Sequence, residues 1–248
     1  MISKSQISLV KSLQQKKHRK EHQLFLVEGL KAIKEFLNSN YTLNAIYATK
    51  DIIPNLPKLS DKQKVFEVTN QELEKISALQ TPQGVLAVFF IPNMSDYSEA
   101  NTSDLTIILD GIQDPGNLGT IIRTADWFGF KQIICSENTV DVYNPKVVQA
   151  TMGSLARINI SYQPLVALLK NSPKPKFGAL LNGENIFSVA WPKQGFVIFG
   201  SEGNGISDEI LPLITHPVTI PGYGNTESLN VAISAAIFCT EMRRNILK

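Results

Sequence analysis

The sequence contains few of the residues on which covalent cross-links and metal sites depend. Its 248 residues include two cysteines, Cys135 and Cys239, and three histidines. The cysteines lie far apart, and neither has a second cysteine or a histidine nearby at the spacing of a metal site. The sequence therefore predicts neither a disulfide framework nor a structural zinc site, and a reducing cytoplasm is the expected location.

Signatures of several common enzyme classes are also missing. There is no G-x-S-x-G nucleophile elbow, and His18, His22 and His216 do not suggest a Ser-His-Asp set. The P-loop and the G-x-G-x-x-G dinucleotide fingerprint are absent. Acidic residues do not cluster as they do around magnesium. These absences argue against triad hydrolases, P-loop nucleotidases and Rossmann oxidoreductases, and no bound metal is predicted.

Long apolar runs are absent as well. No uninterrupted apolar stretch reaches the roughly 18 residues of a membrane span, and the N-terminus lacks the apolar region of a signal peptide. Hydrophobic residues still make up 43% of the chain and charged residues 19%, which are ordinary values for a globular protein with a core. We expect one large domain or two modest ones, with no membrane partner.

Positive charge is concentrated at the N-terminal end, although the formal net charge is only +2. The first 20 residues contain no acid and six basic residues, namely Lys4, Lys11, Lys16, Lys17, Arg19 and Lys20. A basic end on a mildly acidic body favours binding to a phosphate backbone. A solvated helix face or a loose tail explains the same charge equally well.

The first part of the chain, residues 1–91, reads as a small α/β domain. Two helices are predicted within residues 3–38, the first capped by Ser5 and the second starting near Val27, with a basic linker between them. Strand-like runs follow at 45–48, 64–68 and 85–90, with a helix near 71–78. Residues 92–103 are polar and lack periodicity, so they are predicted to be a linker.

The pattern changes from residue 104 to residue 248. Continuous apolar runs, typical of strands buried on both faces, alternate with helical stretches. The predicted strands lie at 105–109, 132–135, 177–181, 196–199 and 217–220, and the predicted helices at 118–128, 145–150, 164–170 and 229–246. This alternation predicts an α/β domain whose parallel-rich sheet has helices on both faces.

Three loops at predicted strand ends carry unusual residues, and ligands bind at the carboxyl ends of strands in such sheets. The first loop follows the strand at 105–109, the second has three glycines within residues 200–205, and the third leads into the last helix. Their polar side chains are Asn117, Arg123, Glu202, Ser228 and Asn230. Asn117 and Ser228 are predicted to cap helices. Read singly, each loop is equally compatible with a tight turn or an ordinary capped helix.

The chemistry that these side chains offer is limited to hydrogen bonds and one fixed positive charge. The three loops contain few side chains that could act as a general acid or a general base. Such a site suits a reaction whose activated group arrives with a cofactor.

In their order and spacing, the three loops resemble the three motifs of the SpoU (TrmH) family of RNA ribose methyltransferases, within the SPOUT class. Asn117-Leu118-Gly119 through Arg123-Thr124-Ala125 is similar to the first motif, residues 199–205 to the second, and Ile220-Pro221 with residues 228–232 to the third. The resemblance covers residues 104–245. Residues 25–29, Phe-Leu-Val-Glu-Gly, resemble the ribosomal-protein-like substrate-binding domain that is often fused to this family.

The resemblance implies a C-terminal SPOUT α/β knot, in which a parallel-rich sheet contains a deep trefoil knot, an exception to the usual rule against threaded chains. It implies S-adenosylmethionine as the cofactor and a homodimer with each site near the interface. The positions expected to hold the cofactor are Leu180, Asn182, Gly183, Gly200, Ile220, Pro221 and Leu229.

The resemblance also implies catalytic roles. Arg123 matches the residue often proposed to activate the ribose hydroxyl. Because a guanidinium stays protonated at neutral pH and is a poor proton acceptor, we favour Arg123 as a clamp for the adjacent phosphate and for developing negative charge. Asn117 and Asn230 would position the ribose and the loops. Glu202 would brace the loops or the substrate, and Ser228 would cap the helix or bind the hydroxyl.

The predicted function is therefore transfer of a methyl group from S-adenosylmethionine to a ribose 2′-hydroxyl of structured RNA. The N-terminal domain favours ribosomal RNA over transfer RNA. Lys16, Lys17, Arg19, Lys20 and Arg123 are predicted to contact RNA phosphates. The alternatives are a tRNA 2′-O-ribose methyltransferase and an RNA-binding protein whose chemistry has been lost.

Overall fold

The structure, a computed structural model, describes residues 2–60, 63–92 and 105–244. Its contacts divide the chain into two compact units. The first unit comprises residues 1–93 together with 141–157, and the second comprises 94–140 and 158–248. The predicted linker, residues 92–103, lies outside the described residues except for Pro92. The return of residues 141–157 to the first unit is a feature that the sequence pattern does not indicate.

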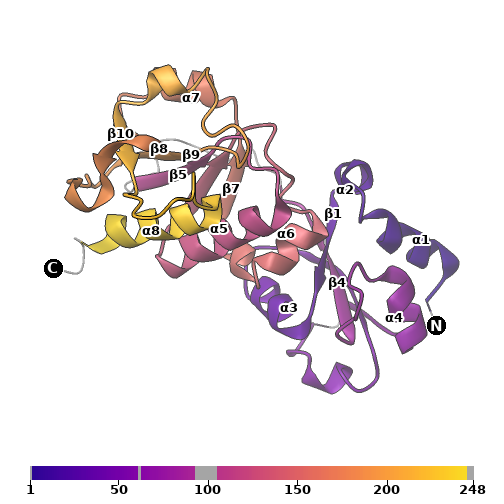
Figure 1. Cartoon of the computed structure of the whole chain (residues 1–248). Helices are drawn as coiled ribbons and strands as arrows, with labels where there is room; N and C mark the ends of the chain where they lie inside the picture. The colour runs from indigo at the N-terminus through magenta and orange to yellow at the C-terminus, as the bar shows by residue number, and fades with distance from the viewer. Residues whose placement is uncertain (1, 61–62, 93–104, 245–248) are drawn as a thin grey trace. The chain divides into compact units, whose positions relative to one another are not determined.

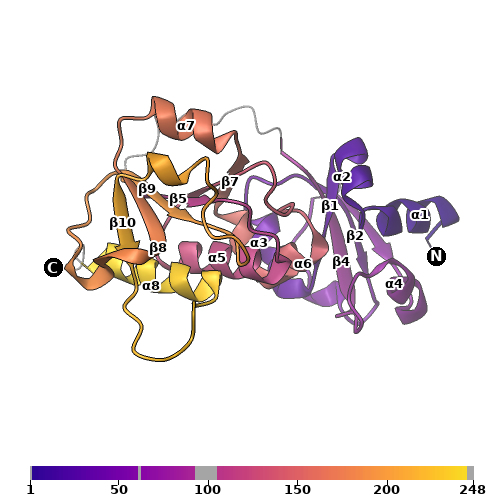
Figure 2. The same ribbon diagram turned by 45° about the horizontal axis from the view of Figure 1, so that its top comes forward.

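The first unit is built on a four-stranded sheet with the order β1-β4-β2-β3; its strands β1 and β4 are labelled in Figure 1, and β2 is labelled in Figure 2. Its strands are β1 (Leu24–Glu28), β2 (Leu43–Ala48), β3 (Lys64–Glu67) and β4 (Val85–Phe90). Strand β4 pairs antiparallel with β1 and β2, and β2 pairs parallel with β3. All five residues of β1 are buried although it is an edge strand, because helices α2, α3 and α6 pack against it.

The helices of the first unit are α1 (Lys4–Ser12), α2 (Lys16–His22), α3 (Leu30–Leu37), α4 (Asn70–Ile76) and α6 (Pro145–Ala150), with 3-10 turns at Ile53–Asn55 and Ser154–Ala156. Apolar side chains of α1 and α4, such as Val10 and Leu73, pack in one cluster with Leu26 of β1. The cap of α1 is Ser3 rather than Ser5, because the Ser3 hydroxyl accepts from the Gln6 backbone amide. The second predicted helix begins later than expected, since residues 24–28 form β1.

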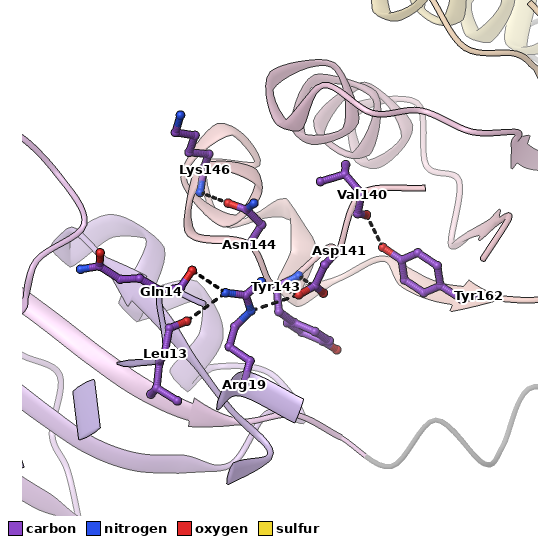
Figure 3. A network of polar contacts seen from close by, with 9 residues as sticks. All are labelled: Leu13, Gln14, Arg19, Val140, Asp141, Tyr143, Asn144, Lys146 and Tyr162. Carbon is purple, nitrogen blue, oxygen red and sulfur yellow. Dashed lines mark hydrogen bonds and ion pairs between the residues drawn. The ribbon is translucent and has the colours of Figure 1, made fainter. Parts of the chain in front are cut away.

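The basic segment that the sequence predicts to be a linker is the helix α2. One of its members is an exception to the predicted role in RNA binding, because Arg19 is only 2% exposed. Its guanidinium donates to Asp141 at 2.6 and 3.0 Å and to the carbonyls of Leu13 and Gln14, each at 2.9 Å (Figure 3). The expectation that Arg19 contacts RNA phosphates is therefore wrong. Its charge is already neutralised inside the first unit.

The second unit has a six-stranded sheet with the order β10-β8-β9-β5-β6-β7, in which all neighbours are parallel. The strands are β5 (Leu105–Leu109), β6 (Gln132–Cys135), β7 (Asn159–Tyr162), β8 (Lys176–Asn185), β9 (Gly195–Phe199) and β10 (His216–Thr219). Strand β7 has no counterpart among the predicted strands, and β8 is longer than predicted. The predicted parallel-rich sheet is confirmed.

Helices cover both faces of this sheet, as predicted. They are α5 (Pro115–Trp127), α7 (Leu165–Asn171) and α8 (Val231–Arg244), with 3-10 turns at Ile186–Ser188 and Leu211–Leu213. Helices α5 and α8 lie side by side on one face, and α7 lies on the other (Figures 1 and 2). Leu165 and Leu169 of α7 pack against Ile108, Ile134 and Ile198 of the sheet. Within the described residues, no helix is long and apolar enough to cross a membrane.

Candidate active site

The first two predicted loops leave the sheet at the same edge. Strands β5 and β9 are parallel neighbours, and their last residues, Leu109 and Phe199, are partners in the register. The two loops are then tied together beyond the sheet. The Asp110 backbone amide donates to the Phe199 carbonyl at 2.8 Å, and the Ser207 amide donates to the Asp110 carboxylate at 2.7 Å. Asp110 is buried, and no motif in the sequence marks it as a residue that joins the loops.

Asn117 lies in the first turn of α5 and does not cap it. The cap is Asp114, whose carboxylate accepts from the Asn117 backbone amide at 2.8 Å. The signal for this was present, because an Asp followed by a proline at the first helical position is a typical helix start. Since Asp114 supplies the cap, the side-chain amide of Asn117 is available for other contacts.

Those contacts join the three loops. The Asn117 side-chain nitrogen donates to the Glu202 carboxylate at 2.5 Å. The Asn117 side-chain oxygen accepts from the side-chain nitrogen of Asn230 at 3.0 Å. The structure thus brings together one polar residue from each predicted motif, in a continuous chain of hydrogen bonds from Asn230 through Asn117 to Glu202. All three residues belong to the second unit.

Asn230 also caps helix α8, a role that the sequence predicts for Ser228. Its side-chain oxygen accepts from the backbone amides of Ala232 at 2.9 Å and Ile233 at 3.3 Å, so Asn230 caps α8. The prediction that Ser228 is the cap is wrong because α8 begins at Val231, three residues beyond Ser228. Ser228 is exposed in the loop before the helix. Its hydroxyl is therefore free to meet a ligand.

Arg123 is exposed on α5, two turns beyond the start of the helix. Its guanidinium makes no hydrogen bond or ion pair with the residues that the structure describes. The geometry therefore does not link Arg123 to the chain formed by Asn230, Asn117 and Glu202. It leaves a full positive charge available to an anion from outside the protein.

The backbone near the predicted cofactor positions is unusually close-packed at two glycines. A Cβ on Gly200 would lie 1.9–2.1 Å from backbone atoms of Gly205 and Ile206. A Cβ on Gly183 would lie 2.5 Å from the Pro217 carbonyl group. Neither position has room for a side chain, so both glycines are required by the path of the chain itself.

The strand β8 bends out of its pairing with β10 in the segment predicted to hold the cofactor. Pro217 pairs with Gly178, but the next residue, Val218, pairs with Glu184. The bypassed residues include Leu180, Asn182 and Gly183. The Thr219 hydroxyl donates to the carbonyl of the neighbouring Leu181 at 2.9 Å and holds this bulge in place.

The residues present fit S-adenosylmethionine. Leu181 is 71% exposed and Leu229 is 49% exposed, so two large apolar side chains near these loops are open to solvent. A nucleoside offers a flat apolar face that such side chains can cover. Ile220 and Pro221, half-buried at the end of β10, and the glycine backbone leave edges for polar groups of the cofactor.

The helix α2 presents most of its positive charge to solvent, since Lys16, Lys17 and Lys20 are exposed. The same helix also carries a cluster of two histidines and one glutamate. His18, Glu21 and His22 have side-chain nitrogen and oxygen atoms within 4.8 Å of one another. Imidazole and carboxylate are metal ligands, but the lysines of the same short helix oppose the approach of a cation.

Comparison with known proteins gives the class of this site. A family model described as "SpoU rRNA Methylase family" matches residues 104–240, and one described as "MRM3-like substrate binding domain" matches residues 4–87. The 23S rRNA (guanosine(2553)-2′-O)-methyltransferase RlmP of Bacillus subtilis is 31% identical over 238 residues, which cover 94% of each chain.

Solved structures agree with this class. A protein of the TrmH family of RNA methyltransferases from Porphyromonas gingivalis is 38% identical, with a TM-score of 0.89 over 99% of each chain. An AdoMet-bound rRNA methyltransferase from Sinorhizobium meliloti is 27% identical, with a TM-score of 0.87 over 100% of this chain and 97% of that one.

The chain belongs to the SpoU rRNA methylase family. The family resemblance seen in the sequence is thereby confirmed. So are the predicted enzyme class, an RNA methyltransferase, and the predicted cofactor, S-adenosylmethionine.

Proposed function

We propose that the protein transfers the methyl group of S-adenosylmethionine to a ribose 2′-hydroxyl of ribosomal RNA. The observation that carries the proposal is the hydrogen-bonded chain of Asn230, Asn117 and Glu202, which fixes one residue of each motif beside the glycine-lined loops. The name of the Bacillus subtilis relative supports both the ribose position and the choice of ribosomal RNA.

The side chains act by positioning. S-adenosylmethionine, when bound, supplies an electrophilic methyl group on a sulfonium. Asn117 and Asn230 hold the motif loops so that the ribose oxygen is aligned with that group, and alignment alone can supply much of the rate. Glu202 anchors the other end of the chain by accepting from Asn117.

Arg123 provides the charge. Its exposed guanidinium is a fixed cation that binds the phosphate next to the target ribose and stabilises negative charge developing on the oxygen. Ser228 donates its hydroxyl to the ribose or to the cofactor.

The cofactor is assigned to the bulge of β8 and the two glycine-lined loops. The residues proposed to hold it are Leu180, Asn182, Gly183, Gly200, Ile220, Pro221 and Leu229. The trefoil knot expected from the family resemblance belongs to this proposal, as do a homodimer, a cytoplasmic location, and a division into an RNA-binding part (1–91), a linker (92–103) and a methyltransferase domain (104–248).

RNA phosphates are assigned to Arg123 and to the exposed lysines of α2, which are Lys16, Lys17 and Lys20. Arg19 is left out because Asp141 neutralises it.

The test is methyl transfer from labelled S-adenosylmethionine to unmodified ribosomal RNA and transfer RNA in parallel, followed by alkaline hydrolysis. A 2′-O-methyl group blocks alkaline cleavage, so we expect label in alkali-resistant dinucleotides from ribosomal RNA. Asn117→Ala should lower kcat by about 100-fold, the size of effect seen when one positioned donor is removed from an active site.

The matched control is Asn171→Ala, which removes the same side chain from the exposed end of α7. It should leave the rate unchanged. Label in mononucleotides would instead indicate base methylation, label only in transfer RNA would overturn the choice of substrate, and cofactor binding without transfer would indicate lost chemistry.

A further inference from the structure

The first unit contains a cavity that the methyl-transfer chemistry does not use. It has a volume of about 250 Å³ and lies between the β1–α4 side of the unit and α6. A smaller cavity of about 90 Å³ shares Glu28 and Gln149 with it, so the two cavities are neighbours, and together they are called the recess below. Pockets for drug-sized ligands measure roughly 300–1,000 Å³. This recess therefore suits a smaller group, of the size of a single ring system.

The walls of the larger cavity are mainly apolar and come from two segments that are far apart in the sequence. Leu26, Ala78 and Leu79 come from the N-terminal segment of the unit. Pro145, Val148 and Ala150 come from α6, which follows more than 60 residues later in the sequence. Helix α6 packs against β1 in the same unit. The cavity therefore exists only because residues 141–157 return to the first unit. An apolar lining of this kind can pack against an aromatic ring.

One acidic group belongs to both cavities. Glu28, the last residue of β1, is only 7% exposed. Its two carboxylate oxygens accept from the Ala78 backbone amide at 2.8 Å and from the Ser77 hydroxyl at 2.5 Å. A carboxylate has about four acceptor positions, so two remain. Glu28 is thus an acceptor held rigidly in place by two donors, and it can still receive N–H groups from a ligand.

The rim of the recess is basic. Lys146 lines the larger cavity and Lys31 the smaller one, and both side chains are exposed. Lys146 extends away from the Arg19–Asp141 contact, as Figure 3 shows. The ligand that combines a flat ring, N–H donors on one edge and a neighbouring anion is a nucleotide.

We propose that this recess is an RNA-base pocket, which receives one unstacked nucleobase bearing an amino group while Lys31 and Lys146 contact the adjacent phosphates. The apolar walls stack on the base, and Glu28 accepts from its N–H edge. Single-stranded RNA loops are read in this way, through splayed bases that are stacked and hydrogen-bonded. Uracil, which lacks an amino group, is the poorest fit. The inference rests on the proposed function, since it takes RNA as the substrate.

The experiment fills the pocket without changing its charge. In Ala78→Phe the added ring is expected to fill the larger cavity, while the backbone amide that donates to the Glu28 carboxylate is kept. We expect this variant of the full chain to bind an unmodified 23S rRNA transcript about tenfold more weakly, which corresponds to about 1.4 kcal/mol, because it removes the stacking of one base. The affinity for S-adenosylmethionine and the salt dependence of RNA binding should stay the same. Gln80→Phe adds the same ring at an exposed position outside the cavity and should bind normally.

Glu28→Gln is the second variant, since it keeps the size of the side chain and removes the charged acceptor. It should also weaken RNA binding about tenfold. Lys146→Ala, in contrast, should lower the salt slope of RNA binding by about 0.7, the value for one phosphate contact on a single strand.

The outcomes separate this proposal from the proposed function. If Ala78→Phe binds the transcript as tightly as the unsubstituted protein, the base pocket is wrong, while ribose methylation by the same variant would leave the proposed function intact. If the unsubstituted protein neither binds nor methylates the transcript, both proposals fail. Equal weakening by Ala78→Phe and Gln80→Phe would also overturn the pocket.

Discussion

At the scale of single residues, the site depends on asparagine side chains that serve the backbone and the motif contacts at once. Asn230 caps α8 through its oxygen and donates to Asn117 through its nitrogen. Asn117 accepts from Asn230 and donates to Glu202. An aspartate at either position would lose the donor, and a leucine would lose both functions. The start of α8 and the geometry of the site are therefore fixed by the same hydrogen bonds.

Crowding of the backbone around Gly200 gives a prediction for the stability of the protein and for its affinity for S-adenosylmethionine. Gly200→Ala would place a Cβ about 2 Å from the backbone of residues 205 and 206, so the motif loop must move. Overpacking of this kind costs about 1–3 kcal/mol, and each kcal/mol lowers the Tm of a chain of this size by about 2–4 °C. Thermal unfolding should show that loss, and calorimetry should show weaker binding of S-adenosylmethionine.

The matched control is in the same loop. Gly203→Ala adds the same methyl group where nothing lies within 4 Å, and it should leave both the Tm and the cofactor affinity unchanged. Similar losses in the two variants would mean that the loop as a whole, and not the crowding at Gly200, determines the result.

The sequence singles out Asn117, Glu202 and Asn230 as candidate site residues, and the structure joins the three by hydrogen bonds. The same sequence pattern assigns the helix caps wrongly. The sequence predicts Asn117 and Ser228 as helix caps because both are good capping residues, but the choice among several such residues depends on where the chain turns. Asp114-Pro115 was the stronger start signal for α5. For α8 the cap is Asn230, to which the sequence analysis assigns only a role in the site.

At the scale of elements, α2 shows why a local pattern can mislead. Residues 16–22 have no apolar stripe, and the sequence predicts a basic linker. The segment is helical, and Arg19 within it is held by Asp141, 122 residues further along the chain. Breaking a buried ion pair by removing one partner costs about 3–5 kcal/mol. No window of local sequence contains that contact, so no periodicity could have predicted it.

The remaining charge of α2 gives a prediction at the same scale. Replacing Lys16, Lys17 and Lys20 together with alanine should weaken RNA binding and lower its salt slope by up to about 2–3, because each phosphate contact contributes about 0.7–0.9. The measurement is the affinity for a ribosomal RNA transcript across a series of salt concentrations. The affinity for S-adenosylmethionine should not change.

A variant with the same change of net charge controls for the loss of positive charge. Lys131, Lys170 and Lys193 are exposed lysines of the second unit. If their replacement flattens the salt dependence as much as the α2 variant does, the effect comes from total charge, and the lysines of α2 are no more than a solvated helix face.

At the scale of the whole molecule, the sequence and the structure agree on two α/β parts but place one segment differently. A linear boundary near residue 92 follows from composition, since the polar stretch there has no periodicity. The contacts assign residues 141–157 to the first unit, although the family model for the methylase includes them. A segment that leaves one part and packs on the other carries no compositional mark. Its helical pattern was predicted, but its location was not.

The proposed homodimer gives the last prediction. Trp127 of α5 is 85% exposed and Ile233 of α8 is 52% exposed, and these two helices pack side by side in the second unit. Apolar side chains this exposed are unfavourable in water and typical of interfaces. Trp127→Glu would bury a charge in the contact, and loss of a central tryptophan weakens an interface by about 2 kcal/mol or more, or about 30-fold in Kd.

Light scattering over a dilution series should therefore show a dimer for the unsubstituted protein and a monomer for Trp127→Glu at concentrations where the dimer persists. Phe90→Glu makes the same kind of change at a 41% exposed residue of the first unit and should remain dimeric. If each active site lies near the interface, the monomeric variant should also lose affinity for S-adenosylmethionine. A Trp127→Glu dimer with full cofactor affinity would exclude α5 from the interface.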